Sequence, residues 1–262
     1  RGRTAKDIVR LSEAIVGWTS GGLGTATIFG CFFFAGTSGS SSADTITIGR
    51  IMIPAMRTRG YNASYAASLA ASGGILGVII PPSLIFIIYG ISTSTSIGEL
   101  FIAGIIPGLL IALTLSISNS LVCRYSTWAL VDKKLFSFRK LLSALWHAKW
   151  GLGAPLIILG GIYGGIFTPT EAAAVAVFYV FLVETVINKE LGVRDIISSL
   201  TRAAIVTGIL GPIIAFSILF GETLAILRVP GNVVNFFVSM SVGHTESVFM
   251  IIFVLLIMGC IL

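Results

Sequence analysis

Two polar, glycine-rich segments, about forty residues apart, interrupt apolar stretches of this chain. Residues 35–44 contain four serines and end at Asp44, and residues 72–83 contain three glycines and the tandem prolines Pro81 and Pro82. Free carbonyl and hydroxyl oxygens at such breaks can replace the hydration shell of Na⁺, and the N-termini of half-helices attract an anion. The two segments therefore predict a site of the kind that carriers use for a sodium ion and an anionic substrate.

Motifs for catalysis or ATP binding are not recognisable in the sequence. It contains neither a Walker lysine motif nor a Ser/His/Asp arrangement, and His147 and His244 are isolated. The three cysteines, Cys31, Cys123 and Cys260, are far apart in apolar runs, where cysteine behaves as a small hydrophobic residue. We therefore expect neither an enzyme nor a bound cofactor.

The composition places both segments in a membrane protein. Of the 262 residues, 55% are hydrophobic and 11% are charged, whereas a soluble domain has about 25% charged residues, and the mean hydropathy is +1.00. Most of the uncharged stretches reach the roughly 20 residues that a helix needs to cross a bilayer. These stretches are residues 14–43, 60–98, 100–123, 150–170, 203–221 and 247–262. We predict an all-α integral membrane fold.

The first break predicts a re-entrant helical hairpin over residues 14–56, with its turn at residues 38–42. A lipid-facing break would leave backbone groups unpaired, so this one must be buried in protein or line a wet cavity. The alternative is a surface loop between two full spans. We favour the hairpin because the second arm, residues 45–56, is short and contains Arg50.

The second break predicts a discontinuous helix over residues 63–90. Two tandem prolines remove two backbone donors and disfavour helix at the residue before them. We expect one half-helix over residues 63–72 and another over residues 82–89.

Further spans are expected over residues 100–123, 150–167, 170–187 and 203–220, with another that begins near Glu246. Thr168, Pro169 and Glu171 have the pattern of a helix start, with a cap, a first-position proline and an acidic first turn. Residues 188–202 are polar and predict a connection.

The positive net charge of +6 is concentrated in residues 124–149, which hold six basic residues and one acidic residue, Asp132. Aromatic and leucine residues alternate with these charges, as in a helix that lies in the interface of the lipid bilayer. Such short basic connections mark the cytoplasmic side. A nucleic-acid partner explains this arrangement less well.

Five motifs, in order and across nearly the whole chain, give the sequence a family resemblance. They are residues 34–44, 53–61, 77–83, 100–108 and 161–174. Together they resemble the large membrane subunit of tripartite ATP-independent periplasmic (TRAP) transporters.

This resemblance implies an elevator-type carrier in the bacterial inner membrane. Such a carrier imports an organic acid, for example a C4-dicarboxylate or sialic acid, and uses Na⁺ as the coupling ion. A periplasmic substrate-binding protein and a small membrane subunit are the implied partners. Residues 1–98 would be part of the transport domain, residues 99–202 would be scaffold-type, and residues 203–262 would begin a second, inverted repeat.

The resemblance also assigns site residues by matched position. The implied sodium ligands, mostly through backbone oxygens, are Ser38, Ser40, Gly77, Ile80 and Pro82. The implied substrate-binding residues are Ser40, Asp44, Ser83 and Arg228. Two of these have competing interpretations: Asp44 would cap the second hairpin arm, and Arg228 would face lipid headgroups.

The sequence departs from the family pattern in two places. It stops at Leu262, before a second hairpin would turn, so we expect a fragment that lacks the second sodium site and does not transport by itself. The sialic-acid branch has an arginine where this chain has Ile226, so sialic acid is not favoured over other acids.

Two other functions remain as alternatives. One is an anion or citrate-type carrier or exchanger that needs no binding protein. The other is a channel lined by residues 38–42.

Overall fold

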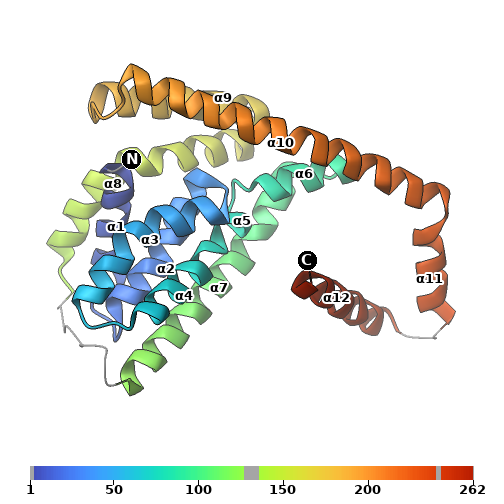
Figure 1. Ribbon diagram of the computed structural model, residues 1–262, viewed down its shortest axis with the longest axis horizontal. Helices are drawn as coiled ribbons and strands as arrows, with labels where there is room; N and C mark the ends of the chain where they lie inside the picture. The colour runs from blue at the N-terminus through green and yellow to red at the C-terminus, as the bar shows by residue number, and fades with distance from the viewer. Residues whose placement is uncertain (1–2, 127–135, 240–242, 262) are drawn as a thin grey trace. The chain divides into compact units, whose positions relative to one another are not determined.

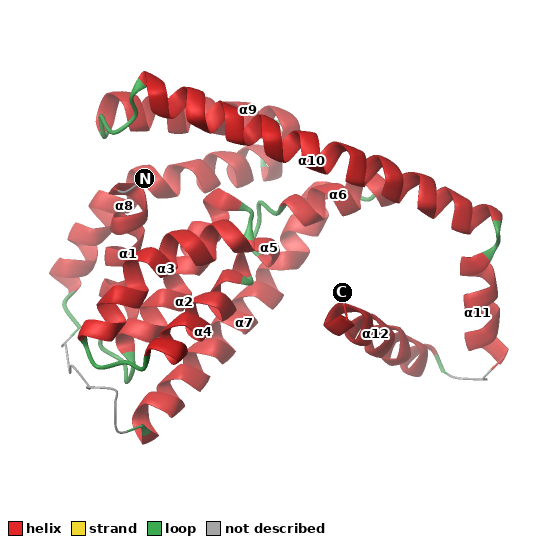
Figure 2. Ribbon diagram, in the orientation of Figure 1, coloured by secondary structure: helices red, strands yellow, loops and turns green. Residues whose placement is uncertain are grey.

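The computed structural model describes residues 3–126, 136–239 and 243–261, and the regular elements in these ranges are helices (Figure 2). The helices of the first part are α1 (Arg3–Val16), α2 (Gly22–Ser38), α3 (Ser41–Thr58), α4 (Ala63–Gly74), α5 (Leu76–Ile79), α6 (Leu84–Thr93) and α7 (Ile97–Tyr125). They are followed by α8 (Phe138–Tyr163), α9 (Pro169–Leu182), the π-helical turn η1 (Val183–Ile187), α10 (Val193–Ile226), α11 (Val229–Ser239) and α12 (His244–Ile261).

Four described segments are long and apolar enough to cross a membrane: Ala63–Thr93, Ile97–Tyr125, Pro169–Ile187 and Val193–Ile226. Three of them exceed the roughly 20 residues that match a hydrocarbon core of about 30 Å, and Pro169–Ile187, with 19 residues, lies within the usual range of a span. The predicted all-α integral membrane fold is confirmed.

The chain divides into two compact units, Arg1–Ile196 and Ile197–Leu262, each described here by itself. In the first unit, α2 lies against α1, α3, α4 and α7 (Figure 1). Its buried core includes the fully buried residues Ile28, Ile48 and Met52. Small residues let the helices approach closely, since a Cβ on Gly73 would lie 3.3 Å from the Cys31 sulfur.

The hairpin consists of α2 and α3, and its predicted start at residue 14 is wrong. Residues 14–16 belong to α1, which is a separate helix, and a turn with Gly21 at φ 71° precedes α2. Hydropathy could not mark this turn because its residues are uncharged. The argument from a short second arm is also wrong, because α3 has 18 residues and measures about 27 Å. Re-entry into the membrane stays a prediction.

The discontinuous helix is confirmed. Helix α4 ends at Gly74, the single turn α5 ends at Ile79, and the chain is extended at Ile80 before α6 begins at Leu84. The Pro81–Pro82 peptide bond is cis. The side chain of Ser83 caps α6 by accepting a hydrogen bond from the Phe86 N–H.

Two boundaries in the second half differ from the prediction. Helix α8 is continuous from Phe138 to Tyr163, so the expected boundary between residues 149 and 150 lies inside one helix. Residues 127–135 of the predicted interfacial segment lie outside the described residues. Of the predicted connection over 188–202, only residues 188–192 are outside a helix, because α10 begins at Val193. Apolar residues among 193–202 favour helix over loop there, so α10 begins before the predicted start at residue 203.

The predicted helix start at Thr168 is confirmed as a capping box. The Glu171 N–H donates to the Thr168 hydroxyl, and the Thr168 N–H donates to the Glu171 carboxylate at 2.8 Å. The division into 1–98, 99–202 and 203–262 stays a prediction, and the compact units separate after Ile196.

Candidate functional site

The hairpin tip and the helix break touch each other, which places the two polar segments at one site. Gly39 has φ 61°, a left-handed conformation that favours glycine, and its N–H closes α2 by donating to the Ala35 carbonyl. A Cβ on Gly39 would lie 2.8 Å from the Pro82 carbonyl oxygen. The tip therefore packs backbone to backbone against the break.

A second contact joins α5 to the start of α3. A Cβ on Gly77 would lie 2.8 Å from the Ser40 carbonyl oxygen, and it would also collide with the Asp44 carboxylate. Only glycine leaves room for these oxygens at this position. Two oxygen-bearing groups, the Ser40 carbonyl and the Asp44 carboxylate, therefore lie against the single helical turn α5.

Asp44 is the charged group at the centre of this arrangement. Its side chain is fully buried, and its Oδ1 accepts a hydrogen bond from the Ser38 hydroxyl. Its Oδ2 is buried and accepts no hydrogen bond from the described residues. A buried carboxylate is costly unless donors or a cation balance it. The site therefore offers a free acceptor oxygen where a cation would be stabilised.

The surroundings of Asp44 distinguish between its two interpretations, as a helix cap and as a substrate-binding residue. Asp44 lies in the first turn of α3, but the N-cap residue is Ser40 and the Asp44 carboxylate bonds to Ser38 rather than to first-turn N–H groups. The capping interpretation is therefore disfavoured. The carboxylate also lies under the tip instead of in the neighbouring pocket, so its predicted contact with substrate stays a prediction without geometric support.

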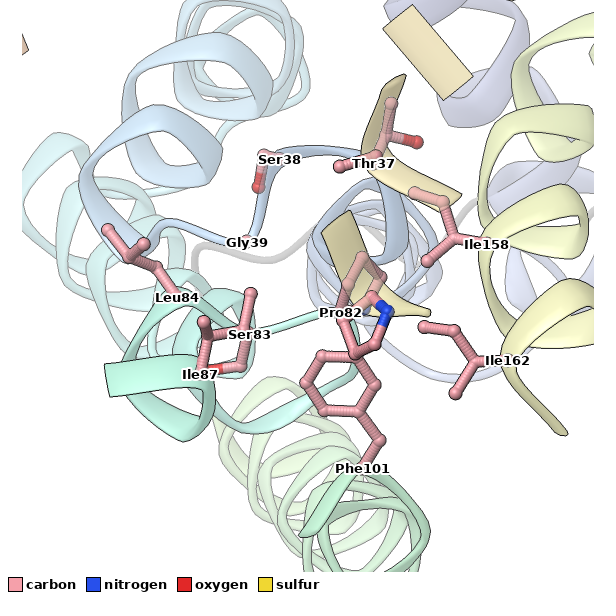
Figure 3. Close-up of a pocket in the computed structure, with 12 residues that line it drawn as sticks. Thr37, Ser38, Gly39, Pro82, Ser83, Leu84, Ile87, Phe101, Ile158 and Ile162 are labelled. Carbon is pink, nitrogen blue, oxygen red and sulfur yellow. The ribbon is translucent and has the colours of Figure 1, made fainter. Parts of the chain in front are cut away.

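A pocket of about 190 Å³ opens beside the tip (Figure 3). Thr37, Ser38 and Gly39 line one side of it, and Pro82 and Ser83 line another. Its other walls are apolar and come from α6, α7, α8 and α9: Leu84, Ile87, Phe101, Ile158, Ile162, Pro169 and Ala173. The pocket is thus polar at the tip and the break and apolar elsewhere.

Ser83 is held in place by its own hydrogen bonds. Its hydroxyl donates to the Val78 carbonyl at 2.7 Å and accepts from the Phe86 N–H at 3.5 Å, and its side chain is fully buried. The Ser40 hydroxyl is more accessible and pairs with the Ser42 hydroxyl at 3.1 Å. Of the two predicted substrate serines, Ser40 is the one with a hydroxyl at the surface of the tip.

The structure brings most of the predicted site residues together. Ser38, Ser40, Gly77, Pro82, Asp44 and Ser83 all lie at the contact between tip and break. The Ile80 side chain points away from the tip, against Gly108 of α7, so only its backbone remains available for a ligand. Arg228 is exposed and belongs to the second unit, and its contact with the substrate stays a prediction.

Two buried polar residues were missed from the sequence, one beside the pocket and one at the other end of α2. The Thr37 hydroxyl is buried without a hydrogen-bond partner among the described residues, next to the pocket. Asn119 of α7 is buried and donates to the Gly21 carbonyl and the Thr25 hydroxyl, each at 3.0 Å. It also accepts from the Tyr65 hydroxyl at 3.0 Å. The signal for Asn119 was present, because it is the only amide in the uncharged stretch 100–123.

Comparisons with known proteins show the family of this chain. A family model described as "Tripartite ATP-independent periplasmic transporter, DctM component" matches residues 1–262. The C4-dicarboxylate TRAP transporter large permease protein DctM of Vibrio cholerae is 43% identical over 191 residues, covering 73% of this chain and 42% of that protein. The isethionate TRAP transporter permease protein DctMQ of Oleidesulfovibrio alaskensis is 37% identical, covering 98% of this chain and 40% of that protein.

The sialic acid TRAP transporter permease protein SiaT of Haemophilus influenzae is 33% identical over 258 residues, which cover 98% of this chain and 42% of that protein. The chain spans about half the length of the curated relatives that it matches. These relatives are transporter permeases rather than enzymes.

Proposed function

The chain belongs to the DctM component family of tripartite ATP-independent periplasmic transporters, and from this premise we propose that it forms part of a sodium-coupled importer of an organic acid. It is a multi-pass protein of the bacterial inner membrane. The relatives are named for C4-dicarboxylates, isethionate and sialic acid, which supports an organic acid as the substrate class.

The buried carboxylate of Asp44 is the observation that carries the sodium coupling. Its Oδ2 lies against Gly77 and close to the Ser40 carbonyl, and it accepts no hydrogen bond from the described residues. A hard cation such as Na⁺ binds oxygen ligands, and backbone carbonyls at helix breaks supply them in carriers. We propose that oxygens of Ser38, Ser40, Gly77, Ile80 and Pro82 hold the ion, with Asp44 as the balancing charge.

The substrate binds, in this proposal, in the pocket beside the ion. Ser40 offers an accessible hydroxyl at the tip, and Ser83 lines the pocket but would have to release the Val78 carbonyl before its hydroxyl could donate to a carboxylate. The hydrocarbon part of the substrate lies against Ile158 and Ile162. Arg228 stays a candidate for a second carboxylate contact. Sodium binding would link the tip to the break and thereby shape the pocket wall that they share.

Two partners complete the proposed transporter. A periplasmic substrate-binding protein delivers the acid, and a small membrane subunit accompanies the large one, as the family description and the DctMQ relative suggest. In this proposal the binding protein determines most of the selectivity.

The test is uptake by the full-length permease with its small subunit in proteoliposomes. We expect saturable uptake of a radiolabelled organic acid that requires both an inward Na⁺ gradient and the binding protein. Uptake that persists without Na⁺ would reject the coupling. Uptake without the binding protein would favour an exchanger or citrate-type carrier, and flux that does not saturate would favour a channel.

A further inference from the structure

A second site lies between α1 and the N-terminal half of α8, away from the hairpin tip. The two helices run side by side in opposite directions (Figure 1): Thr4 contacts Gly151 at one end, and the rings of Trp18 and Phe136 pack edge to face at the other. An open groove of about 620 Å³ lies along them. The lining residues of this α1–α8 groove are Arg10, Glu13, Ala14, Ser137, Arg139, Lys140, Ser143, Ala144 and His147.

The charges of the α1–α8 groove are mainly positive. Three cationic side chains and one carboxylate, that of Glu13, line it. Arg10 also pairs with Asp7 at 3.4 Å, but 68% of the Arg10 side chain is exposed. Arg139 and Lys140 are exposed and form no ion pair with a described residue. The groove therefore presents uncompensated positive charge to an incoming ligand.

Aromatic and aliphatic side chains surround this charge. Trp18 and Trp146 are 54% and 67% exposed, and the Lys149 ammonium lies 3.4 Å from the centroid of the Trp146 ring. Exposed apolar side chains continue along α8 from the groove at Phe138, Leu142 and Leu145. Tryptophan beside basic residues is typical of the level of the lipid headgroups, where one end of a side chain meets water and the other meets acyl chains.

We propose that the α1–α8 groove binds the phosphate headgroup of an anionic phospholipid. The phosphate oxygens accept charge-assisted hydrogen bonds from Arg139 and Lys140, with Arg10 opposite them on α1. The acyl chains lie along Phe138 and Leu142. A partner protein with acidic residues would satisfy the charge too, but the adjoining apolar and tryptophan surface favours a ligand that combines an anionic head with hydrocarbon chains.

The proposal is tested on the full-length permease in detergent, loaded with equal amounts of phosphatidylglycerol and phosphatidylcholine. Retained lipids are counted by native mass spectrometry. We expect the unaltered protein to retain phosphatidylglycerol preferentially, and R139Q/K140Q to lower that preference by about tenfold, since each basic side chain near the surface adds to the attraction. The charge-conserving variant R139K/K140R should keep most of it.

The matched control is R194Q/R202Q, which removes two exposed basic residues outside the groove and should leave lipid retention unchanged. Equal retention by R139Q/K140Q and the unaltered protein would overturn the proposal. It would also be overturned if inorganic phosphate displaced the bound lipid completely, because the groove would then be a site for free anions. Loss of the small subunit from R139Q/K140Q with lipid retention unchanged would identify a protein contact and reject the lipid site.

Discussion

At the scale of single residues, the function proposed for this chain depends on one carboxylate and one glycine. Among the described residues, Ser38 alone donates a hydrogen bond to the buried carboxylate of Asp44. Gly77 provides the space in which the second oxygen lies. These two residues come from different polar segments of the sequence, and they meet only through the fold.

Asp44→Asn is expected to weaken sodium binding by at least about tenfold, because a bond to a charged group contributes about 1.5–3 kcal/mol. The amide keeps the size of the side chain but removes its charge. The measurement is the Na⁺ concentration that half-maximally stabilises the purified full-length permease against heat. Glu99→Gln, at the exposed start of α7, is the control and should bind Na⁺ normally. Unchanged sodium affinity in Asp44→Asn would remove Asp44 from the ion site.

Gly77→Ala is expected to lower thermal stability and sodium affinity together, because its Cβ meets the Ser40 carbonyl and the Asp44 carboxylate. Gly160→Ala in α8 is the matched control, since open space surrounds a Cβ there. Alanine is the better helix former by about 1 kcal/mol, so this control should be neutral or stabilising. Thermal unfolding with and without Na⁺ measures both variants. If Gly77→Ala and Gly160→Ala had the same thermal stability and sodium affinity, the space around Gly77 would be large enough for a Cβ.

At the scale of helices, the site depends on the packing that holds α2, α4 and α7 together. Asn119 connects these three helices from the middle of an apolar span, through Gly21, Thr25 and Tyr65. The hairpin arm α2 and the half-helix α4 are thereby fixed to a long helix that borders the pocket. A polar side chain buried in a membrane protein constrains the positions of the neighbouring helices, because it must form its hydrogen bonds within the protein.

Asn119→Ala is expected to destabilise the protein by about 1–3 kcal/mol, because the hydrogen bonds of the amide are lost and buried polar atoms are left without their partner. Asn232→Ala, at an exposed position of α11, is the control and should change stability little. The free energy of unfolding in a mild detergent, measured by denaturant titration, distinguishes the two. A small effect in Asn119→Ala would mean that apolar packing alone fixes these helices.

At the scale of the whole molecule, the site lies in one of the two units. Ser38, Asp44, Gly77 and Pro82 all belong to Arg1–Ile196, whereas Arg228 belongs to Ile197–Leu262. All the sodium ligands that we propose therefore lie within the first unit.

Arg228→Gln is expected to leave the sodium affinity within about twofold of its normal value, because Arg228 is exposed, is not among the proposed sodium ligands, and exposed substitutions change free energies by about 0.5 kcal/mol at most. The same variant tests the predicted carboxylate contact, which requires a weaker apparent affinity for the organic acid in the uptake assay. Sodium titration of thermal stability gives the first quantity. A large loss of sodium affinity would show that Arg228 acts on the site in the first unit.

The sequence by itself determined the membrane class and the two breaks, and the site residues assigned by resemblance stay a prediction. Long uncharged stretches are stable in the lipid bilayer. Glycine and proline interrupt helices because of their own backbone geometry, which does not depend on contacts with other parts of the fold. The same local logic predicted the helix start at Thr168, with Glu171 in the first turn, which the structure confirms. It failed for the start of the hairpin, because the turn near Gly21 differs from its neighbours in backbone conformation rather than in hydropathy.

Only the tertiary structure decided which of these residues meet. It placed the Asp44 carboxylate beneath the tip against Gly77, turned the Ile80 side chain toward α7, and put Arg228 in a different unit. It also added Ile158 and Ile162 to the pocket, although α8 lies far away in the sequence. Residues distant along the chain are brought together by helix packing, and packing depends on the shapes of whole helix surfaces rather than on any local pattern.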